Sequence, residues 1–145
     1  MTSVPNIFAA GNVLRGADMH DLCALEGKIA AQGILKKLGS DRTQTDRSIR
    51  MKAESPIRHV VPQKIEPRQI RKTLFSKLFP WPALQVERTL RNPIIEAWSG
   101  KEKIWEDSSW KLIANTRIPI PVEKFDWNRG DPEKEIMLKV KKAHN

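Results

Sequence analysis

The middle of the chain does most to limit what this sequence can fold into. Residues 40–66 show no hydrophobic periodicity of the helical or the strand kind, and Pro56 and Pro62 interrupt them before Pro67. A residue that precedes proline is driven out of the helical region of backbone space. Because a structureless connection of this length is uncommon inside a compact domain, we expect an extended linker or binding segment over residues 40–66.

Positive charge is concentrated in and just after this segment. Residues 40–80 hold ten basic and four acidic side chains, which is +6 of the formal net charge of +9, and the flanks are nearly balanced. Such a basic stretch is typical of a surface that contacts an anion, and arginine suits bidentate phosphate contacts. The alternative is a solvated linker without a ligand. The residues predicted to contact nucleic acid are Arg42, Arg47, Arg50, Arg58, Arg68, Arg71 and Lys72.

The sequence on either side of residues 40–66 favours helices. Apolar residues recur at helical spacing over residues 18–39 and again over residues 67–79, where Pro67 suits the first position of a helix. Shorter helical stretches are expected over residues 83–91 and 93–100.

The end of the chain gives a clear local helix pattern. Residues 131–143 begin with an aspartate cap and early glutamates and finish with lysines, in agreement with the helix dipole, so they predict a C-terminal helix. Residues 110–122 are expected to be strand-like or extended. Pro119 and Pro121 each remove a hydrogen-bond donor that a central strand needs, so they predict either an edge strand, in at most one short pair, or a polyproline-like run across another surface.

These elements predict a mainly α chain with long extended, proline-punctuated segments. It would be small, irregular and non-compact, and ordered by its partners. Three parts are expected: an N-terminal arm with an amphipathic helix over residues 1–39, the basic extended linker over residues 40–66, and a helical, Trp-rich docking region over residues 67–145.

The aromatic residues form an unusual set, with five tryptophans and no tyrosine. Tryptophan is favoured at interfaces because it supplies a large rigid area and one hydrogen-bond donor. It is equally able to anchor a small core. The residues predicted to form a protein interface are Trp81, Trp98, Trp105, Trp110 and Trp127.

Catalytic patterns are weak throughout the sequence. His20, Cys23 and Glu26 would lie down one side of the first helix, but a structural zinc site normally needs four ligands in two spaced pairs. The glycines form no phosphate-binding pattern, and no pair of carboxylates stands in an apolar setting that would make an acid–base couple. We therefore expect no enzymatic activity, no cofactor and no metal.

The compartment is expected to be intracellular and reducing. Cys23 is the single cysteine, which excludes an intramolecular disulfide, and no apolar run approaches the ~20 residues of a membrane-spanning helix. The first residues also lack the charged and then apolar pattern of a signal peptide. The sequence does not distinguish the cytoplasm from an organelle.

Together these features predict a non-enzymatic structural subunit of a ribosome-type ribonucleoprotein. Its basic extended segment would contact the phosphate backbone of RNA, and its other regions would contact neighbouring subunits. The alternative is a subunit of a protein lattice without nucleic acid: a virion or phage particle, a filament or a multi-subunit complex. A third option is a regulator that folds on a single partner. The separation of the aromatic residues from the basic run favours a protein partner over RNA.

Overall fold

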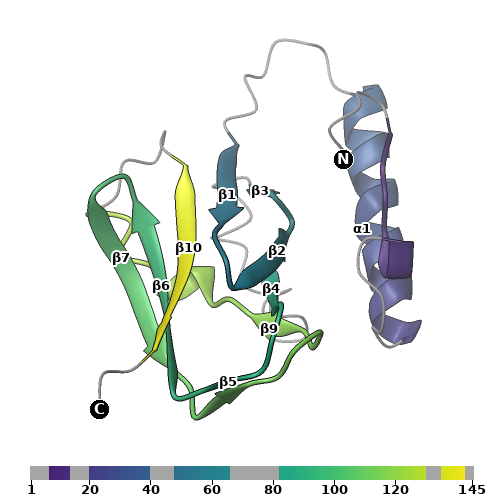
Figure 1. Ribbon diagram of the computed structural model, residues 1–145. Coiled ribbons are helices and arrows are strands. Elements are labelled where there is room, and N and C mark those ends of the chain that lie inside the picture. Colours follow the sequence, from purple (N-terminus) through teal and green to yellow (C-terminus); the bar gives the residue numbers. More distant parts are fainter. Residues whose placement is uncertain (1–6, 14–19, 40–47, 66–81, 130–134, 143–145) are drawn as a thin grey trace. The chain divides into compact units, whose positions relative to one another are not determined.

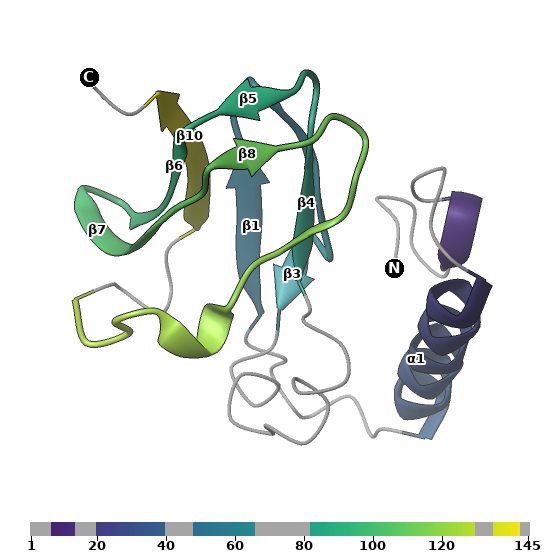
Figure 2. The ribbon, with the colours of Figure 1, turned by 90° about the horizontal axis from the view of Figure 1, so that it is seen from below.

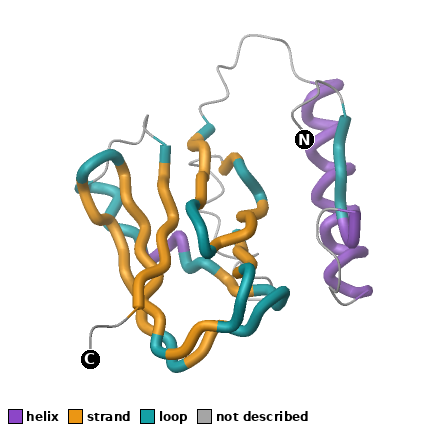
Figure 3. Tube along the Cα trace, viewed as in Figure 1, coloured by secondary structure: helices purple, strands orange, loops and turns teal. Residues whose placement is uncertain are grey.

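The computed structural model describes residues 7–13, 20–39, 48–65, 82–129 and 135–142 (Figure 1). The chain divides into two compact units, Met1–Thr45 and Asp46–Asn145. The described residues hold ten strands and one α-helix, so the prediction of a mainly α chain is wrong (Figure 3). The protein is mostly β, with its strands arranged in several sheets.

The first unit contains the α-helix. Helix α1 (His20–Gly39) confirms the helix expected from the apolar spacing, and a single 3-10 turn, η1 (Gly11–Val13), packs against it. The backbone N–H of Gly11 donates to Oε2 of the buried Glu26 over 2.9 Å. Gly11 has a φ of +70°, and a Cβ placed there would lie 3.2 Å from Cβ of Cys23. Glycine is therefore required for this turn to approach the helix.

The side chains of α1 do not form one continuous buried stripe. Leu35 and Leu38 are 68% and 79% exposed, whereas the apolar residues of the first turns are half-buried. No helix in the described part of the chain is long and apolar enough to span a membrane.

The second unit is built around one large sheet. This sheet has five strands, in the order β3 (Lys64–Ile65), β1 (Ile49–Ala53), β10 (Ile136–Lys142), β6 (Pro93–Ser99) and β7 (Glu102–Ser108). Strands β1 and β10 run parallel, and the other neighbouring strands run antiparallel. Gly100, with a φ of +62°, supplies the backbone conformation for the two-residue turn between β6 and β7.

Two smaller sheets complete this unit. One has three strands, in the order β2 (Ile57–Val61), β4 (Ala83–Val86) and β9 (Ile118–Pro119). The other is a two-stranded ribbon of β5 (Leu90–Arg91) and β8 (Lys111–Leu112), which lie side by side in Figure 2. The 3-10 turn η2 (Val122–Lys124) follows β9.

The segment expected to be an extended linker forms three strands in its described part. In β1, Ile49 and Met51 are buried while Arg50 and Lys52 are exposed, which is the alternation of a strand with one face on a core. This pattern is only one strand long, and charged residues and prolines surround it. Pro56 and Pro62 lie on either side of β2 and interrupt no strand.

The predicted C-terminal helix is wrong, because residues 136–142 form β10. Ile136 and Leu138 are buried, and Met137 and Lys139 on the other face are half-buried. The helix-type charge pattern is worth only about 0.3–1 kcal/mol per residue. Pairing of β10 with β1 on one side and β6 on the other outweighs it.

The other local predictions concern the shorter helices and the edge strands. The stretches expected to be helical after residue 82 contain β4, β5 and β6, and the helix expected over residues 67–79 lies outside the described residues. Strands β8 and β9 lie where a pair of edge strands was expected, but they do not form that pair. They pair with β5 and β4 rather than with each other.

A single hydrophobic core joins the three sheets. Aromatic residues close one side of it: the Phe125 ring centroid lies 5.4 Å from that of Trp105 and 5.5 Å from that of Trp127. The indole N–H of Trp127 donates to the backbone O of Val122 over 3.0 Å. The buried core residues are Ile49, Met51, Ile57, Val60, Ile65, Leu84, Val86, Leu90, Ile95, Ala97, Ile104, Leu112, Ile120, Val122, Phe125, Ile136 and Leu138.

Candidate functional site

The β5–β8 ribbon has one face on the core and one in solvent. Leu90 pairs with Leu112, and both are buried. The next pair along, Arg91 and Lys111, therefore lies on the outward face, where paired residues of an antiparallel ribbon project together. Two like charges directly opposite each other repel. Neither side chain forms an ion pair with a carboxylate in the part of the chain that the structure describes.

Trp110 stands at the start of this ribbon with its ring in solvent. Its side chain is 79% exposed, and the Nζ of Lys111 lies 5.7 Å from the centroid of its ring. Tryptophan is on average among the more buried residues, so this degree of exposure is informative. Ile113, which is 48% exposed, extends the apolar surface beyond Lys111.

The backbone at Trp110 and Ser109 is hydrogen-bonded to the junction between β5 and β6. The backbone N–H of Asn92 donates to the carbonyl O of Trp110 over 2.9 Å, and that of Ser109 donates to the carbonyl O of Pro93 over 3.0 Å. Asn92 has a φ of +47°, a left-handed conformation that asparagine tolerates better than most residues. The exposed ring is therefore presented by an ordered turn.

Contacts from β2 and from the loop before β5 order the turn after β8. The Nη1 of Arg58 donates to Oδ1 of Asn115 over 3.0 Å, and the backbone N–H of Ala114 donates to Oγ1 of Thr89 over 3.2 Å. Arg88 is exposed beside Thr89. We use the name β8 strip for six side chains of β8 and of the segments beside it: Arg58, Arg88, Arg91, Trp110, Lys111 and Ile113. All are exposed except Lys111, which is half-buried.

The β8 strip differs in charge from the outer face of the five-stranded sheet. None of the four cations of the strip is ion-paired with a described carboxylate. Near the strip, the carboxylate of Glu87 accepts a hydrogen bond from Oγ of Ser55 over 3.2 Å. The strip is thus a cationic surface around one exposed aromatic ring.

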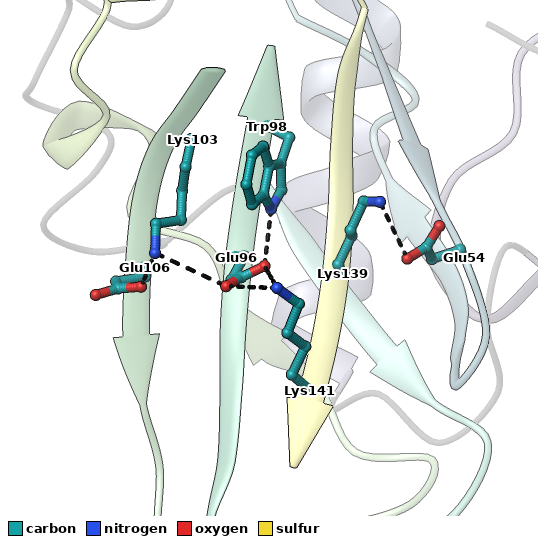
Figure 4. A network of polar contacts seen from close by, with 7 residues as sticks. All are labelled: Glu54, Glu96, Trp98, Lys103, Glu106, Lys139 and Lys141. Atoms are coloured by element: carbon teal, nitrogen blue, oxygen red, sulfur yellow. Dashed lines mark hydrogen bonds and ion pairs between the residues drawn. The ribbon is translucent and has the colours of Figure 1, made fainter. Parts of the chain in front are cut away.

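On the outer face of the large sheet, in contrast, cations face carboxylates of the same chain. Glu135 lies 2.7 Å from Nζ of Lys52 and 3.5 Å from Nη1 of Arg50. The Nζ of Lys139 lies 3.5 Å from Glu54, as Figure 4 shows. A phosphate would have to compete with these carboxylates for the same cations.

Glu96 lies at the centre of this face and is only 4% exposed. Its carboxylate accepts the indole N–H of Trp98 over 2.8 Å and lies 3.0 Å from Nζ of Lys141 and 3.8 Å from Nζ of Lys103 (Figure 4). Burial raises the pKa of this carboxyl. The hydrogen bonds from Trp98 and Lys141 and the charges of Lys141 and Lys103 outweigh that effect, so the pKa of Glu96 is lowered overall.

The second carboxylate in this network lies on β7. Lys103 donates to Glu106, and this hydrogen bond raises the pKa of the Lys103 ammonium group. The Nζ of Lys141 also lies 5.6 Å from the ring centroid of Trp98. These contacts satisfy the charges on this face within the chain.

The residues predicted to contact nucleic acid are therefore separated in the structure. Arg58 belongs to the β8 strip, and Arg50 is paired with Glu135 on the outer sheet face. The remaining residues of this prediction lie outside the described residues: Arg42, Arg47, Arg68, Arg71 and Lys72.

The predicted interface tryptophans also have different environments. Trp110 is exposed on the strip, Trp98 covers Glu96, and Trp105 and Trp127 pack against the core. Trp81 lies outside the described residues. The structure thus places Arg58 against the turn after β8 and Trp110 directly before β8, although the sequence separates them widely.

Sequence reasoning missed Arg88, Arg91 and Lys111 as residues of this surface. The adjacent pair Trp110 and Lys111 was a local signal, because it places a cation beside an aromatic ring. Arg91 gave no such signal. It reaches the strip only because β5 pairs with β8 across the intervening β6–β7 hairpin.

The residues considered as metal ligands contact other groups. Sγ of Cys23 donates to Oδ1 of Asn12 over 3.4 Å, and Glu26 accepts the N–H of Gly11. Among the described residues, no three His, Cys, Asp or Glu side chains are grouped to hold a metal ion.

By its described residues, the chain is a mostly β protein with one helical unit and a cationic, aromatic surface on a two-stranded ribbon. Comparison with protein families, curated proteins and solved structures finds no match.

Proposed function

We propose that this protein is a non-enzymatic structural subunit of an intracellular ribonucleoprotein, and that it contacts RNA through the β8 strip. The observation that carries the proposal is the cross-strand pair of Arg91 and Lys111. Two cations directly opposite each other, with no described carboxylate between them, gain stability when an anion binds there.

The chemistry of the strip suits a phosphate backbone. Arg58, Arg88 and Arg91 offer planar donor groups for phosphate oxygens, and Lys111 adds a compact charge. Each phosphate that these cations neutralise releases counterions, so binding depends steeply on salt. The exposed indole of Trp110 supplies the aromatic surface that the basic run lacks in the sequence.

A protein partner is the second candidate, and one observation favours it. Leu35 and Leu38 are largely exposed near the end of α1, three residues apart and so neighbours on one side of the helix, and contiguous exposed apolar surface marks protein contacts. In this reading the protein is a subunit of a protein lattice, and the β8 strip faces an acidic protein surface. RNA contact through the strip and protein contact through α1 are also compatible in one assembly.

The test is binding of the full-length protein to fluorescently labelled RNA, measured by anisotropy at stepped salt concentrations. We expect the double variant Arg91→Glu, Lys111→Glu to lose at least about tenfold in affinity, because two attractive charges become repulsive.

The matched control is Lys101→Glu, Lys124→Glu, which makes the same change of charge at two exposed lysines outside the strip. Equal losses in the two double variants would mean that net charge alone drives binding. Absence of RNA binding by the unchanged protein at low salt would reject the proposal in favour of a protein partner.

A further inference from the structure

We propose that the β8 strip takes single-stranded RNA and that Trp110 stacks on an unpaired base. This inference rests on the proposed function and adds the class of nucleic acid that the site selects. It starts from the exposure of the indole, which is 79% accessible although the ring is one of the largest apolar surfaces in the protein.

The setting of the ring matches what base stacking requires. One cation, Nζ of Lys111, lies 5.7 Å from the ring centroid, and Arg91 lies opposite Lys111 on the same outward face. Because this Nζ lies over one face of the ring and the side chain is 79% exposed, a base stacks on the opposite face while the cation meets an adjoining phosphate. Ile113, two residues beyond Lys111 on the outward side, adds an apolar contact next to the cations.

The backbone contacts of the turn support the same conclusion. Hydrogen bonds from Asn92 to Trp110 and from Ser109 to Pro93 hold the turn against the ribbon and the start of β6. The backbone that carries the indole is therefore ordered before a ligand arrives, and little backbone order has to be gained on binding.

The strip has no comparable fit to double-stranded RNA. In an A-form duplex the bases are stacked on one another, and the deep major groove is too narrow for side chains to read. An exposed indole has no base face to meet there. An unpaired base offers its face to any aromatic side chain, which makes this kind of contact tolerant of sequence.

The test uses the full-length protein and three labelled probes of equal length: a single-stranded RNA, a duplex RNA and an abasic ribose–phosphate strand. The variants are Trp110→Phe, which keeps an aromatic ring, and Trp110→Leu, which keeps an apolar side chain without one. Circular dichroism and urea unfolding of each variant establish that it is folded before its affinity is compared.

The unchanged protein is expected to bind the single strand more tightly than the abasic strand. Trp110→Leu should lose about 5- to 100-fold for the single strand and less than about twofold for the abasic strand. Trp110→Phe should retain most of the affinity for the single strand.

The results that overturn the inference differ from those that overturn the proposed function. Equal binding of the single-stranded and abasic probes, or equal losses for all probes in Trp110→Leu, would reject stacking while RNA contact stands. Failure of the unchanged protein to bind any of the three probes would reject RNA contact itself.

Discussion

Trp98 donates its indole N–H to the carboxylate of Glu96 over 2.8 Å, from a position two residues further along the same strand. Both side chains project from the outer face of the sheet, yet Glu96 is nearly inaccessible to solvent. The indole and the lysines around it therefore act as a polar cover over one charged group. A buried charge of this kind is tolerated because its partners are in place.

Replacing Glu96 by Gln should destabilise the second unit by about 1–3 kcal/mol, since Lys141 and Lys103 lose the charge that they face. Urea unfolding followed by circular dichroism measures the change. Glu106→Gln is the control, because its side chain is more than half exposed and solvent screens its pairing with Lys103. Equal effects of the two substitutions would show that burial of Glu96 is unimportant.

The lowered pKa of Glu96 predicts how this contribution depends on pH. A carboxyl with a lower pKa in the folded state stabilises the fold above its ordinary value of 4.5, and loses that contribution as pH falls through the folded value. The difference in stability between the unchanged protein and Glu96→Gln should be constant near neutral pH. It should become smaller as the pH falls below 4.5. Urea unfolding midpoints of both proteins, measured across this pH range, test this prediction. A gap that widens on acidification has the opposite sign and contradicts the assignment.

Two glycine substitutions in the first unit should have opposite effects. Gly11→Ala should destabilise it, because Gly11 has a positive φ and its Cβ would press on Cys23. Gly27→Ala should stabilise helix α1 by about 1 kcal/mol, because space there is open and alanine is the better helix former. Thermal unfolding followed at the helical band of the circular dichroism spectrum measures both. A destabilising Gly27→Ala would mean that α1 is not helical at this position.

The alternation of β10 gives a direct test of strand against helix at the end of the chain. Leu138→Ala should cost about 2–5 kcal/mol, because Leu138 is fully buried in the core. Met137→Ala should cost clearly less, since Met137 is half-buried on the opposite face. Chemical unfolding of the two variants compares them, and a larger loss at Met137 would contradict the observed register.

Salt dependence provides a count of the phosphates at the β8 strip. For single strands, the slope of log K against log salt is about −0.7 for each neutralised phosphate. Arg91→Ala should reduce the slope by about that amount and leave Trp110-dependent discrimination between probes unchanged. Anisotropy titrations at four or more salt concentrations give the slope. An unaltered slope would remove Arg91 from the interface.

Some of the fold could be predicted from local sequence, and some could not. Helix α1 follows from apolar spacing over twenty residues, which is long enough to be unambiguous. The helix prediction at β10 is wrong because the glutamates before this strand and the lysines within it imitate helix-end charges, whereas its strand character depends on β1 and β6 far along the chain. Strand β1 was hidden for a similar reason: its alternation covers only five residues, between two polar stretches.

Part of the candidate site could likewise be predicted from local sequence. Arg58 was predicted from the local density of charge, and Trp110 from its residue type. Their shared proximity to β8 could not be predicted, because it depends on the hydrogen bond from Arg58 to Asn115 in the turn after β8. Arg91 joins this surface only through its pairing with Lys111. Long-range pairing of short strands has no signature in a single sequence.

The position of β10 between β1 and β6 also constrains when the second unit can form during synthesis. A ribosome synthesises β1 and β6 before β10. Each of these two strands therefore has an unpaired edge while the rest of the chain is synthesised. Exposed strand edges are templates for pairing with other chains. The nascent protein is therefore most vulnerable to aggregation in the interval before residues 135–142 emerge, and its five-stranded sheet closes only when they do.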